Sequence, residues 1–267
     1  QFVQKTMEIA QDLFPEFDIA KPSIRTSHLI KGRIPSAIGK PAKDLKEHEK
    51  TLYYERCAFV MEIPAVVENI NGNNLSLTIG GVRAYNQENL FSKKSPEKFK
   101  VFIGFKNMVC TNLCISTDGL ADQIRVTNLD QLSYAVEGLL LQYDREHHLG
   151  LMERMSRHYL SEEQFAHFIG KLRMFQFMNK SDQKKLFPVA LNDGQINNVV
   201  KNYYTCPNFK RSDDGSINLW RLYNLFTEAN KSSYIDNNFE RSVNAYELTN
   251  NLANSLQNRS ENWFIHN

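Results

Sequence analysis

The sequence predicts an α+β fold in which an antiparallel sheet from the N-terminal half packs against a helical C-terminal half. Between residues 52 and 116 the chain is rich in β-forming residues and alternates apolar with polar positions, whereas after residue 129 apolar residues recur at helical spacing. Strands that precede helices are typical of α+β domains. We expect one domain over residues 1–267, with a helix and basic loop at 1–50, a β-rich part at 51–128 and a helical part at 129–267.

The first 50 residues predict a short helix followed by a long loop. Apolar residues at helical spacing, closed by a proline, mark the helix: Phe2, Ile9, Leu13, Phe14 and Pro15. Residues 21–46 then contain three prolines and two glycines, a composition typical of loops.

The β-rich part predicts a hairpin and a long alternating strand. CAFVMEIPAVVENI and LSLTIGGV are separated by the turn sequence NGNN, and Pro64 indicates an edge position or a bulge. In KFKVFIGF, Phe99, Val101, Ile103 and Phe105 share one face while three lysines and a glycine share the other, as in a half-buried strand. The alternation continues to Ser116 and predicts that the strand does too.

Cys110 and Cys114 lie within this predicted strand. Residues four apart on a strand are about 13 Å apart, at ~3.3 Å per residue, whereas a disulfide needs Cα atoms within about 7 Å. We therefore interpret the two cysteines as small buried thiols, and a metal or redox site there requires a turn or a helix instead. Four cysteines in 267 residues do not make a disulfide framework.

Composition excludes few classes of protein. The net charge is +2, which by itself implies neither nucleic acid nor membrane as a partner. No apolar run approaches the ~18 residues of a membrane helix, and the N-terminal residues lack the pattern of a secretory leader. We expect a cytoplasmic protein with reduced thiols and no membrane partner.

The C-terminal half predicts a series of helices. One helix is expected from Leu129 to His158. Further helices are expected from a capping box at Ser161 to Met178, from a cap at Asn192 or Asp193 to Tyr203, from a cap at Ser216 to Asn230, and from a cap at Asp236 to Leu256.

Residues 21–46 are the first candidate site. They contain seven bases and one acid, a local charge of +6. A basic loop punctuated by proline and glycine can clamp a nucleic-acid backbone, and the alternative is a solvated surface loop. The candidate nucleic-acid-binding residues are Arg25, Lys31, Arg33, Lys40 and Lys43.

The sequence KNYYTCPNFKR, residues 201–211, is the second candidate. It interleaves Tyr203 and Tyr204 with Lys210 and Arg211, and single-strand binding combines rings that stack on bases with cations that contact phosphates. The favoured alternative is a helix end whose tyrosines pack on the core.

Asp144 and His148 form a third candidate, because residues four apart share a helix face and can hold a metal. No HExxH pattern is present and arginines surround the pair, so a solvated charged face is the favoured interpretation. No phosphate-binding loop, dinucleotide fingerprint or nucleophile elbow occurs, and we predict no cofactor, no metal and no catalytic residue.

Two stretches together resemble a large uncharacterised phage/plasmid-like family: VCTN at 109–112 and SINLWRLYNLFTEANK at 216–231. Its motif positions correspond here to Cys110, Asn112, Trp220, Asn224, Thr227 and Glu228. KGRIPSAIGKPAKDL and YYERCAFVMEIP are more closely similar to an uncharacterised family from Bacteroides-type bacteria. Many relatives carry a histidine soon after the Thr-Glu pair, where this chain has residues 229–232 without one.

The resemblance implies a protein of mobile elements that binds nucleic acid without catalysis, with single-stranded DNA favoured, in recombination or replication support. The alternatives are a protein-interaction module that acts on host defence and an enzyme that uses Glu228. On a helix, Trp220, Asn224, Thr227 and Glu228 form one stripe, which is either a buried polar network that includes Asn112 or the wall of a pocket. The sequence does not predict an oligomeric state.

Overall fold

A computed structural model of the chain describes residues 1–27, 29–37, 39–84 and 96–266, without the side chains of residues 29–31, 35 and 51–54. Its centre is a six-stranded antiparallel sheet with the order β1-β4-β5-β6-β7, in which β8 also pairs with β6. The strands are β1 (Ser23–Thr26), β4 (Arg56–Ile70), β5 (Asn73–Ala84), β6 (Glu97–Asn107), β7 (Leu113–Cys114) and β8 (Leu120–Val126). With helices dominating the C-terminal half, this confirms the α+β prediction.

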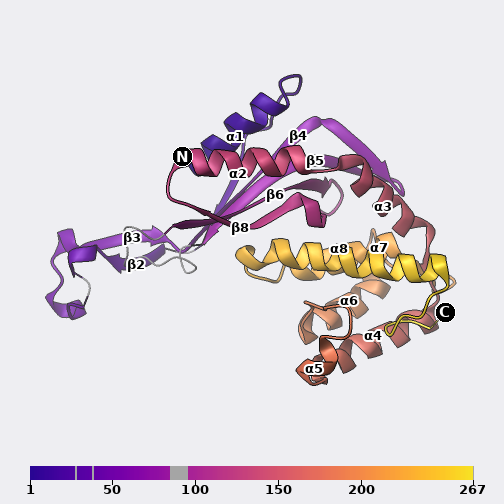
Figure 1. Ribbon diagram of the computed structural model, residues 1–267. Helices are drawn as coiled ribbons and strands as arrows, with labels where there is room; N and C mark the ends of the chain where they lie inside the picture. The colour runs from indigo at the N-terminus through magenta and orange to yellow at the C-terminus, as the bar shows by residue number, and fades with distance from the viewer. Residues whose placement is uncertain (28, 38, 85–95, 267) are drawn as a thin grey trace.

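Helices cover both faces of the sheet (Figure 1). One face packs against α1 (Phe2–Leu13), α2 (Leu129–Gln142) and α3 (Arg145–Arg157), and the other against α8 (Ile235–Asn258). On the first face Phe2 meets Phe59 with ring centroids 5.1 Å apart, and on the second Phe102 of β6 meets Phe239 of α8 at 4.7 Å. The helix at the N-terminus is confirmed as predicted.

The expectation that β6 is half-buried was wrong, because α8 covers its lysine face. Lys100 is only 7% exposed. Its ammonium donates to the main-chain oxygen of Asp236 at 2.5 Å and pairs with Glu240. A lysine whose ammonium donates to a carbonyl oxygen and pairs with a carboxylate is satisfied while buried.

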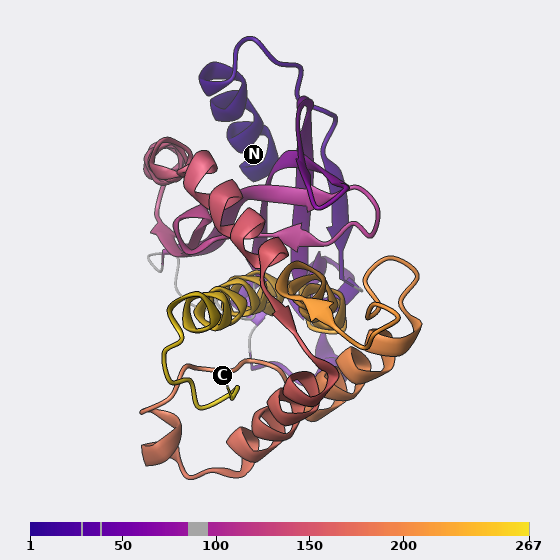
Figure 2. The same cartoon turned by 90° about the vertical axis from the view of Figure 1, so that its right-hand side faces the viewer.

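The remaining helices lie on the side of α8 that faces away from the sheet (Figure 2). They are α4 (Glu162–Phe177), α5 (Lys180–Gln183) and α6 (Asp193–Thr205), with α7 (Leu219–Asn230) between them and the sheet. A capping box at Ser161 opens α4 as predicted, and Asn192, one of the two caps expected there, opens α6. A two-residue pairing joins β9 (Tyr159–Leu160) to β10 (Ile217–Asn218). None of the described helices is long and apolar enough to cross a membrane.

The β4–β5 hairpin follows its predicted turn. Asn71 and Gly72 both have positive φ, +50° and +80°, which is the backbone of a type I′ turn. The strand register shifts between Ile63 and Val67, around Pro64, and this agrees with a bulge, one of the two expectations for that proline.

The predicted loop at residues 21–46 is wrong in two places. Residues Ser23–Thr26 form the edge strand β1, which is exposed at every position and therefore carries no apolar alternation. Residues Leu29–Arg33 form β2, which pairs antiparallel with β3 (Lys50–Tyr54), a partner beyond the loop that local composition does not reveal. The segment 29–54, here named the arm, projects away from the rest of the fold (Figure 1).

The prediction that β6 continues to Ser116 was also wrong. The chain turns at residues 108–110, passes through Thr111 with φ of +58°, and returns as β7 beside β6, with Phe105 opposite Cys114. Asn107 closes the turn, since its side chain accepts from the amide of Val109 at 3.0 Å. Cys110 and Cys114 therefore do not lie on one extended strand, and the distance of about 13 Å expected from strand geometry does not apply to them.

Three helix boundaries differ from those predicted. The helix expected at 129–158 is two helices, because Asp144 leaves helical geometry and caps α3 through the amide of His147 at 2.9 Å. Asn218 caps α7, whereas Ser216 bonds instead to Asp214. Tyr234 precedes α8, and Asp236 pairs with Arg56 rather than capping the helix.

Candidate nucleic-acid interface

A cavity of about 370 Å³ lies between the β1 edge of the sheet and the junction of α7 with α8. Its sheet side comes from β1, β4, β6 and β7, and its helix side from the end of α7 and the first two turns of α8. Apolar lining comes from Val60, Leu113, Ile235 and Phe239. We call this cavity the groove.

Four bases converge on the groove: Lys21, Arg25, Lys106 and Lys231. Glu62 is the acid in its lining and pairs with Lys106 at 2.5 Å. Lys21 and Arg25 are exposed and make no ion pair with any other described residue. A concave surface with an excess of one charge concentrates the field on its contents, so the groove attracts anions.

Glu62 remains ionised and fixes Lys106 in the groove. Burial alone raises the pKa of the Glu62 carboxyl, but hydrogen bonds from Lys106 and from Ser76 outweigh burial, so the pKa is lowered. On the opposite wall Lys231 pairs with Glu228 at 2.7 Å and donates to the main-chain oxygen of Cys110. Lys106 and Lys231 are therefore held by their partners, whereas Lys21 and Arg25 remain available to a ligand.

Thr111 lines the groove in a backbone conformation that β-branched residues rarely adopt, with φ of +58°. An asparagine network holds the turn on either side of it. Asn112 donates to the main-chain oxygen of Asn224 at 3.0 Å, and Asn107 donates to the Asn224 side-chain oxygen at 3.2 Å. Strained backbone that its surroundings hold in place is concentrated at binding and catalytic sites.

The motif residues that carry the family resemblance lie partly in the core and partly on the surface. Trp220, Asn224 and Thr227 are buried: Trp220 donates to Asn73 at 2.8 Å, and Thr227 donates to the main-chain oxygen of Asn224 at 3.1 Å while also lining the groove. Glu228 is 37% exposed and is not among the residues that line the groove. Burial raises the pKa of the Cys110 thiol to about 11, which makes it a poor nucleophile at neutral pH.

Tyr234 is the residue that sequence reasoning missed. It is 70% exposed, it precedes the groove residue Ile235, and the guanidinium of Arg56 lies 4.7 Å from its ring centroid. Arg56 is held by Asp236 at 2.7 Å. An exposed ring beside a fixed cation is a platform on which a base can stack. Arg56 and Tyr234 are far apart in the sequence, so no local sequence pattern places them together.

The candidate bases of residues 21–46 divide between groove and arm. Arg25 lies on β1 in the groove, whereas Arg33, Lys40 and Lys43 are exposed on the arm. Lys40 pairs with the buried Glu49, and Arg33 donates to the main-chain oxygen of Lys40 at 2.5 Å. The side chain of Lys31 lies outside the described ones.

The candidates at 201–211 lie on and after α6 and do not line the groove. Tyr203 is buried and stacks on Phe165, with centroids 4.0 Å apart and rings 6° from parallel. Tyr204 is exposed with Arg211 5.2 Å from its ring, and its hydroxyl donates to Glu162. Lys210 is exposed. Tyr204 is thus the ring of this stretch that a ligand can reach.

The two residues of the third candidate, Asp144 and His148, are a helix cap and a core residue. Asp144 caps α3, and His148 is fully buried with its Nδ1 2.7 Å from the hydroxyl of Tyr143. Burial lowers the pKa of His148 to about 3, so the ring is neutral. Over the described ranges no three His, Cys, Asp or Glu side chains are placed to hold a metal, and all four cysteines are free thiols.

Comparison with known proteins gives one family. A family model described as "Domain of unknown function, B. Theta Gene description (DUF3871)" matches residues 1–265. No curated protein matches the chain, and no solved structure does. The match confirms the expected uncharacterised Bacteroides-type family, while kinship with the phage/plasmid-like family stays a prediction.

Proposed function

The chain belongs to this family of unknown function, whose model spans nearly all of it, and we propose that it binds single-stranded nucleic acid in the groove without catalysing a reaction. The observation that carries the proposal is the convergence of four bases on one groove beside the exposed ring of Tyr234. These bases come from the segment before β1, from β1, from β6 and from the residue after α7, so the fold assembles the positive surface.

The size and lining of the groove favour a single strand over a duplex. A volume of about 370 Å³ is that of a small-molecule site and holds part of one strand. Lys21 and Arg25 at the open edge contact phosphates, and the half-buried Val60, Leu113 and Ile235 offer apolar surface to a base. A neighbouring base stacks on Tyr234, next to the cation of Arg56.

The arm extends the same positive surface. Chain continuity carries β1, with Arg25, into β2 within three residues, and Lys43 is an exposed base of the arm with no ion pair to a described residue. Exposed lysine and arginine side chains contact phosphates whatever the base sequence. We expect the arm to contribute non-specific phosphate contacts outside the groove.

The test is a fluorescence-anisotropy titration of labelled single-stranded DNA, single-stranded RNA and duplex DNA at ~50 and ~200 mM salt. With about two phosphate contacts from Lys21 and Arg25 and about two more from the arm, affinity for a single strand should fall roughly 50-fold between the two salt concentrations. The double variant Lys21→Glu with Arg25→Glu should lose most of this affinity. Tyr234→Ala should weaken binding by about 5- to 150-fold, the range of one base–ring stack.

A matched double variant controls for net charge. Lys180 begins α5 and Lys184 directly follows it; both are exposed and lie outside the groove. Replacing both by glutamate changes the total charge as much as the groove variant does, so binding should remain near wild type. If no nucleic acid binds at ~50 mM salt, or if both double variants weaken binding equally, the groove is not the interface.

The cellular role that fits such an activity is support of recombination or replication on a mobile element, in the cytoplasm, where free thiols persist. Action on host defence through a protein partner is the second candidate from the sequence, and a failed titration would favour it. An enzyme that uses Glu228 finds no support in the geometry, because this carboxylate pairs with Lys231 on the surface.

A further inference from the structure

A second cavity, of about 650 Å³, lies away from the groove, between the segment after β7, the start of α3 and the middle of α8. Asp118, His147 and Glu247 surround it together with three asparagines of α8. Leu151, Phe187 and Pro188 add apolar wall. The volume is within the range of small-molecule sites.

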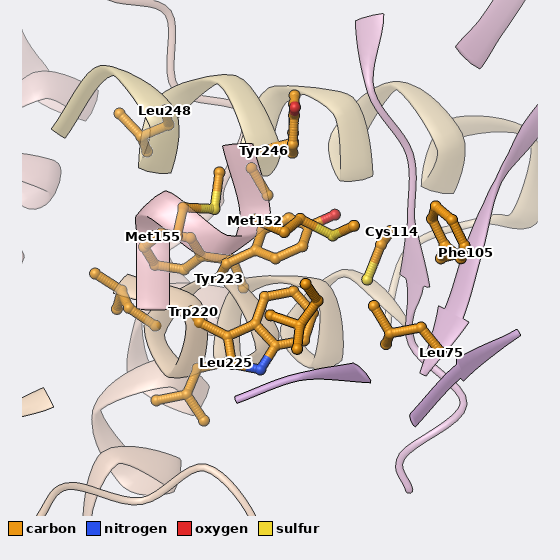
Figure 3. Packing of buried hydrophobic residues seen from close by; sticks show 14 of the residues in the cluster. Leu75, Phe105, Cys114, Met152, Met155, Trp220, Tyr223, Leu225, Tyr246 and Leu248 are labelled. Atoms are coloured by element: carbon orange, nitrogen blue, oxygen red, sulfur yellow. The ribbon is translucent and has the colours of Figure 1, made fainter. Parts of the chain in front are cut away.

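Two buried hydroxyls in the lining lack partners. Ser116 is 2% exposed and Tyr246 is 3% exposed, and neither hydroxyl oxygen forms a hydrogen bond to any described residue. Tyr246 extends from α8 into the packed layer that also holds Tyr223 (Figure 3). Its ring centroid lies 5.0 Å from that of His148, whose Nε2 also has no hydrogen-bond partner among the described residues. Buried polar groups are nearly always paired, and each unpaired one costs about 1–3 kcal/mol, so this cluster requires an explanation.

The charges of the cavity exclude two classes of ligand. Among the described residues the lining contains carboxylates but no lysine or arginine, so it disfavours phosphates and other anions. No trio of His, Cys, Asp or Glu in the described part of the chain is arranged for a metal ion. The class of ligand that remains is an organic molecule that is neutral or positively charged.

The lining groups favour a neutral molecule rich in hydroxyls. A hydroxyl both donates and accepts, so its best partner does the same, whereas an amine only donates. Burial raises the pKa of the Tyr246 hydroxyl, which keeps its proton at neutral pH and remains a donor. Carboxylates such as those of Asp118 and Glu247 accept from ligand hydroxyls. Glu247 already accepts from Thr117 at 2.6 Å, which orients it.

We propose that this cavity binds a small neutral saccharide whose hydroxyls pair with Ser116 and Tyr246 in the floor and with Asp118 and Glu247 at the rim. The C–H face of the sugar packs against Phe187 and Pro188. Both floor oxygens are closed to solvent in the unliganded fold, and neither has a hydrogen-bond partner among the described residues. The site is separate from the groove and does not depend on nucleic-acid binding.

The test is saturation-transfer NMR of the full chain with glucose, galactose, mannose, N-acetylglucosamine and their common disaccharides, beside putrescine and inorganic phosphate. At least one sugar should receive saturation from the protein. Tyr246→Phe and Ser116→Ala should each lower its affinity by about tenfold, the worth of one hydrogen bond. Tyr134→Phe, at an exposed tyrosine of α2, is the matched control and should bind as wild type does.

Thermal unfolding separates a binding hydroxyl from a structural one. Tyr246→Phe removes an unpartnered group, so its melting temperature should equal or exceed that of wild type. A lower melting temperature would mean that the hydroxyl has a structural partner, and would overturn the proposal. Binding of putrescine or phosphate alone, binding of none of the probes, or sugar binding that survives both floor variants and Glu247→Gln would overturn it as well.

Discussion

The side-chain amide of Asn112 donates to the main-chain oxygen of Asn224 at 3.0 Å, and so ties the turn after β6 to the middle of α7. Asn107 adds a second bond to the same residue, and Asn224 in turn donates to the main-chain oxygen of Trp220 at 2.9 Å. All three asparagines are buried. This network fixes the distance between Thr111 and Thr227, which line the groove from the sheet side and the helix side.

Asn224→Ala should lower the free energy of unfolding by about 2–4 kcal/mol, because it removes the partner of the buried Asn107 amide and leaves a small cavity. Urea unfolding measures the change. Asn237→Ala, at an exposed position in the first turn of α8, is the matched control and should stay within about 0.5 kcal/mol of wild type. Equal effects of the two substitutions would show that the network contributes nothing to stability.

Gly104→Ala should destabilise the sheet by about 1–3 kcal/mol or more. A Cβ at Gly104 would lie 2.3 Å from the main-chain oxygen of Cys114, and backbone in a paired strand cannot yield cheaply. Gly138→Ala is the opposite case, because a Cβ there meets nothing within 4 Å inside α2. It should gain about 1 kcal/mol through helix propensity. Unfolding curves of both variants check the pair, and a neutral Gly104→Ala would contradict the close approach.

Local sequence patterns predicted the structural elements that depend only on neighbouring residues. The capping box at Ser161 and the turn at Asn71–Gly72 each depend on a few adjacent residues, and the structure has both. The reversal at Thr111 was missed because the alternation of apolar residues keeps its phase through the turn. The strand at Leu29–Arg33 was missed because its partner β3 begins at Lys50. The burial of Lys100 depends on α8, which lies 136 residues further along the chain at Asp236.

The groove was predictable only in part, for the same reason. Arg25 belongs to a basic stretch that the sequence displays. Lys106 and Lys231 come from separate elements and resemble ordinary surface lysines until the fold brings them to one cavity. The pairing of Arg56 with Tyr234 likewise depends on α8 lying beside the start of β4. Single-sequence patterns carry no information on such long-range neighbours.

Thr111→Gly should raise the free energy of unfolding by about 1 kcal/mol, because an L residue at φ of +58° is strained and glycine is not. Asn71→Gly is the matched comparison at φ of +50°, and its gain should be smaller because asparagine tolerates this region. Denaturant unfolding of both variants measures the two changes in the free energy of unfolding. A loss of stability in Thr111→Gly would mean that the threonine side chain contributes more than its backbone strain costs.

Stability should fall in mild acid because of His148. The ring is buried and neutral, with its pKa lowered to about 3 by burial, against about 6.5 in the unfolded chain. Between these two values the unfolded chain binds one proton more than the folded chain does. The free energy of unfolding therefore falls as the pH drops from about 6.5 toward 3, by up to about 1.4 kcal/mol per pH unit from this residue alone.

His148→Gln removes that proton while keeping a hydrogen-bonding group beside the hydroxyl of Tyr143. Urea unfolding at pH 7.5, 6, 5 and 4.5 should show a shallower decline for the variant than for wild type, whatever its stability at pH 7.5. The carboxylates contribute equally to both proteins, so the difference in slope isolates His148. Parallel curves for wild type and His148→Gln would mean that the buried ring accepts a proton in the folded state.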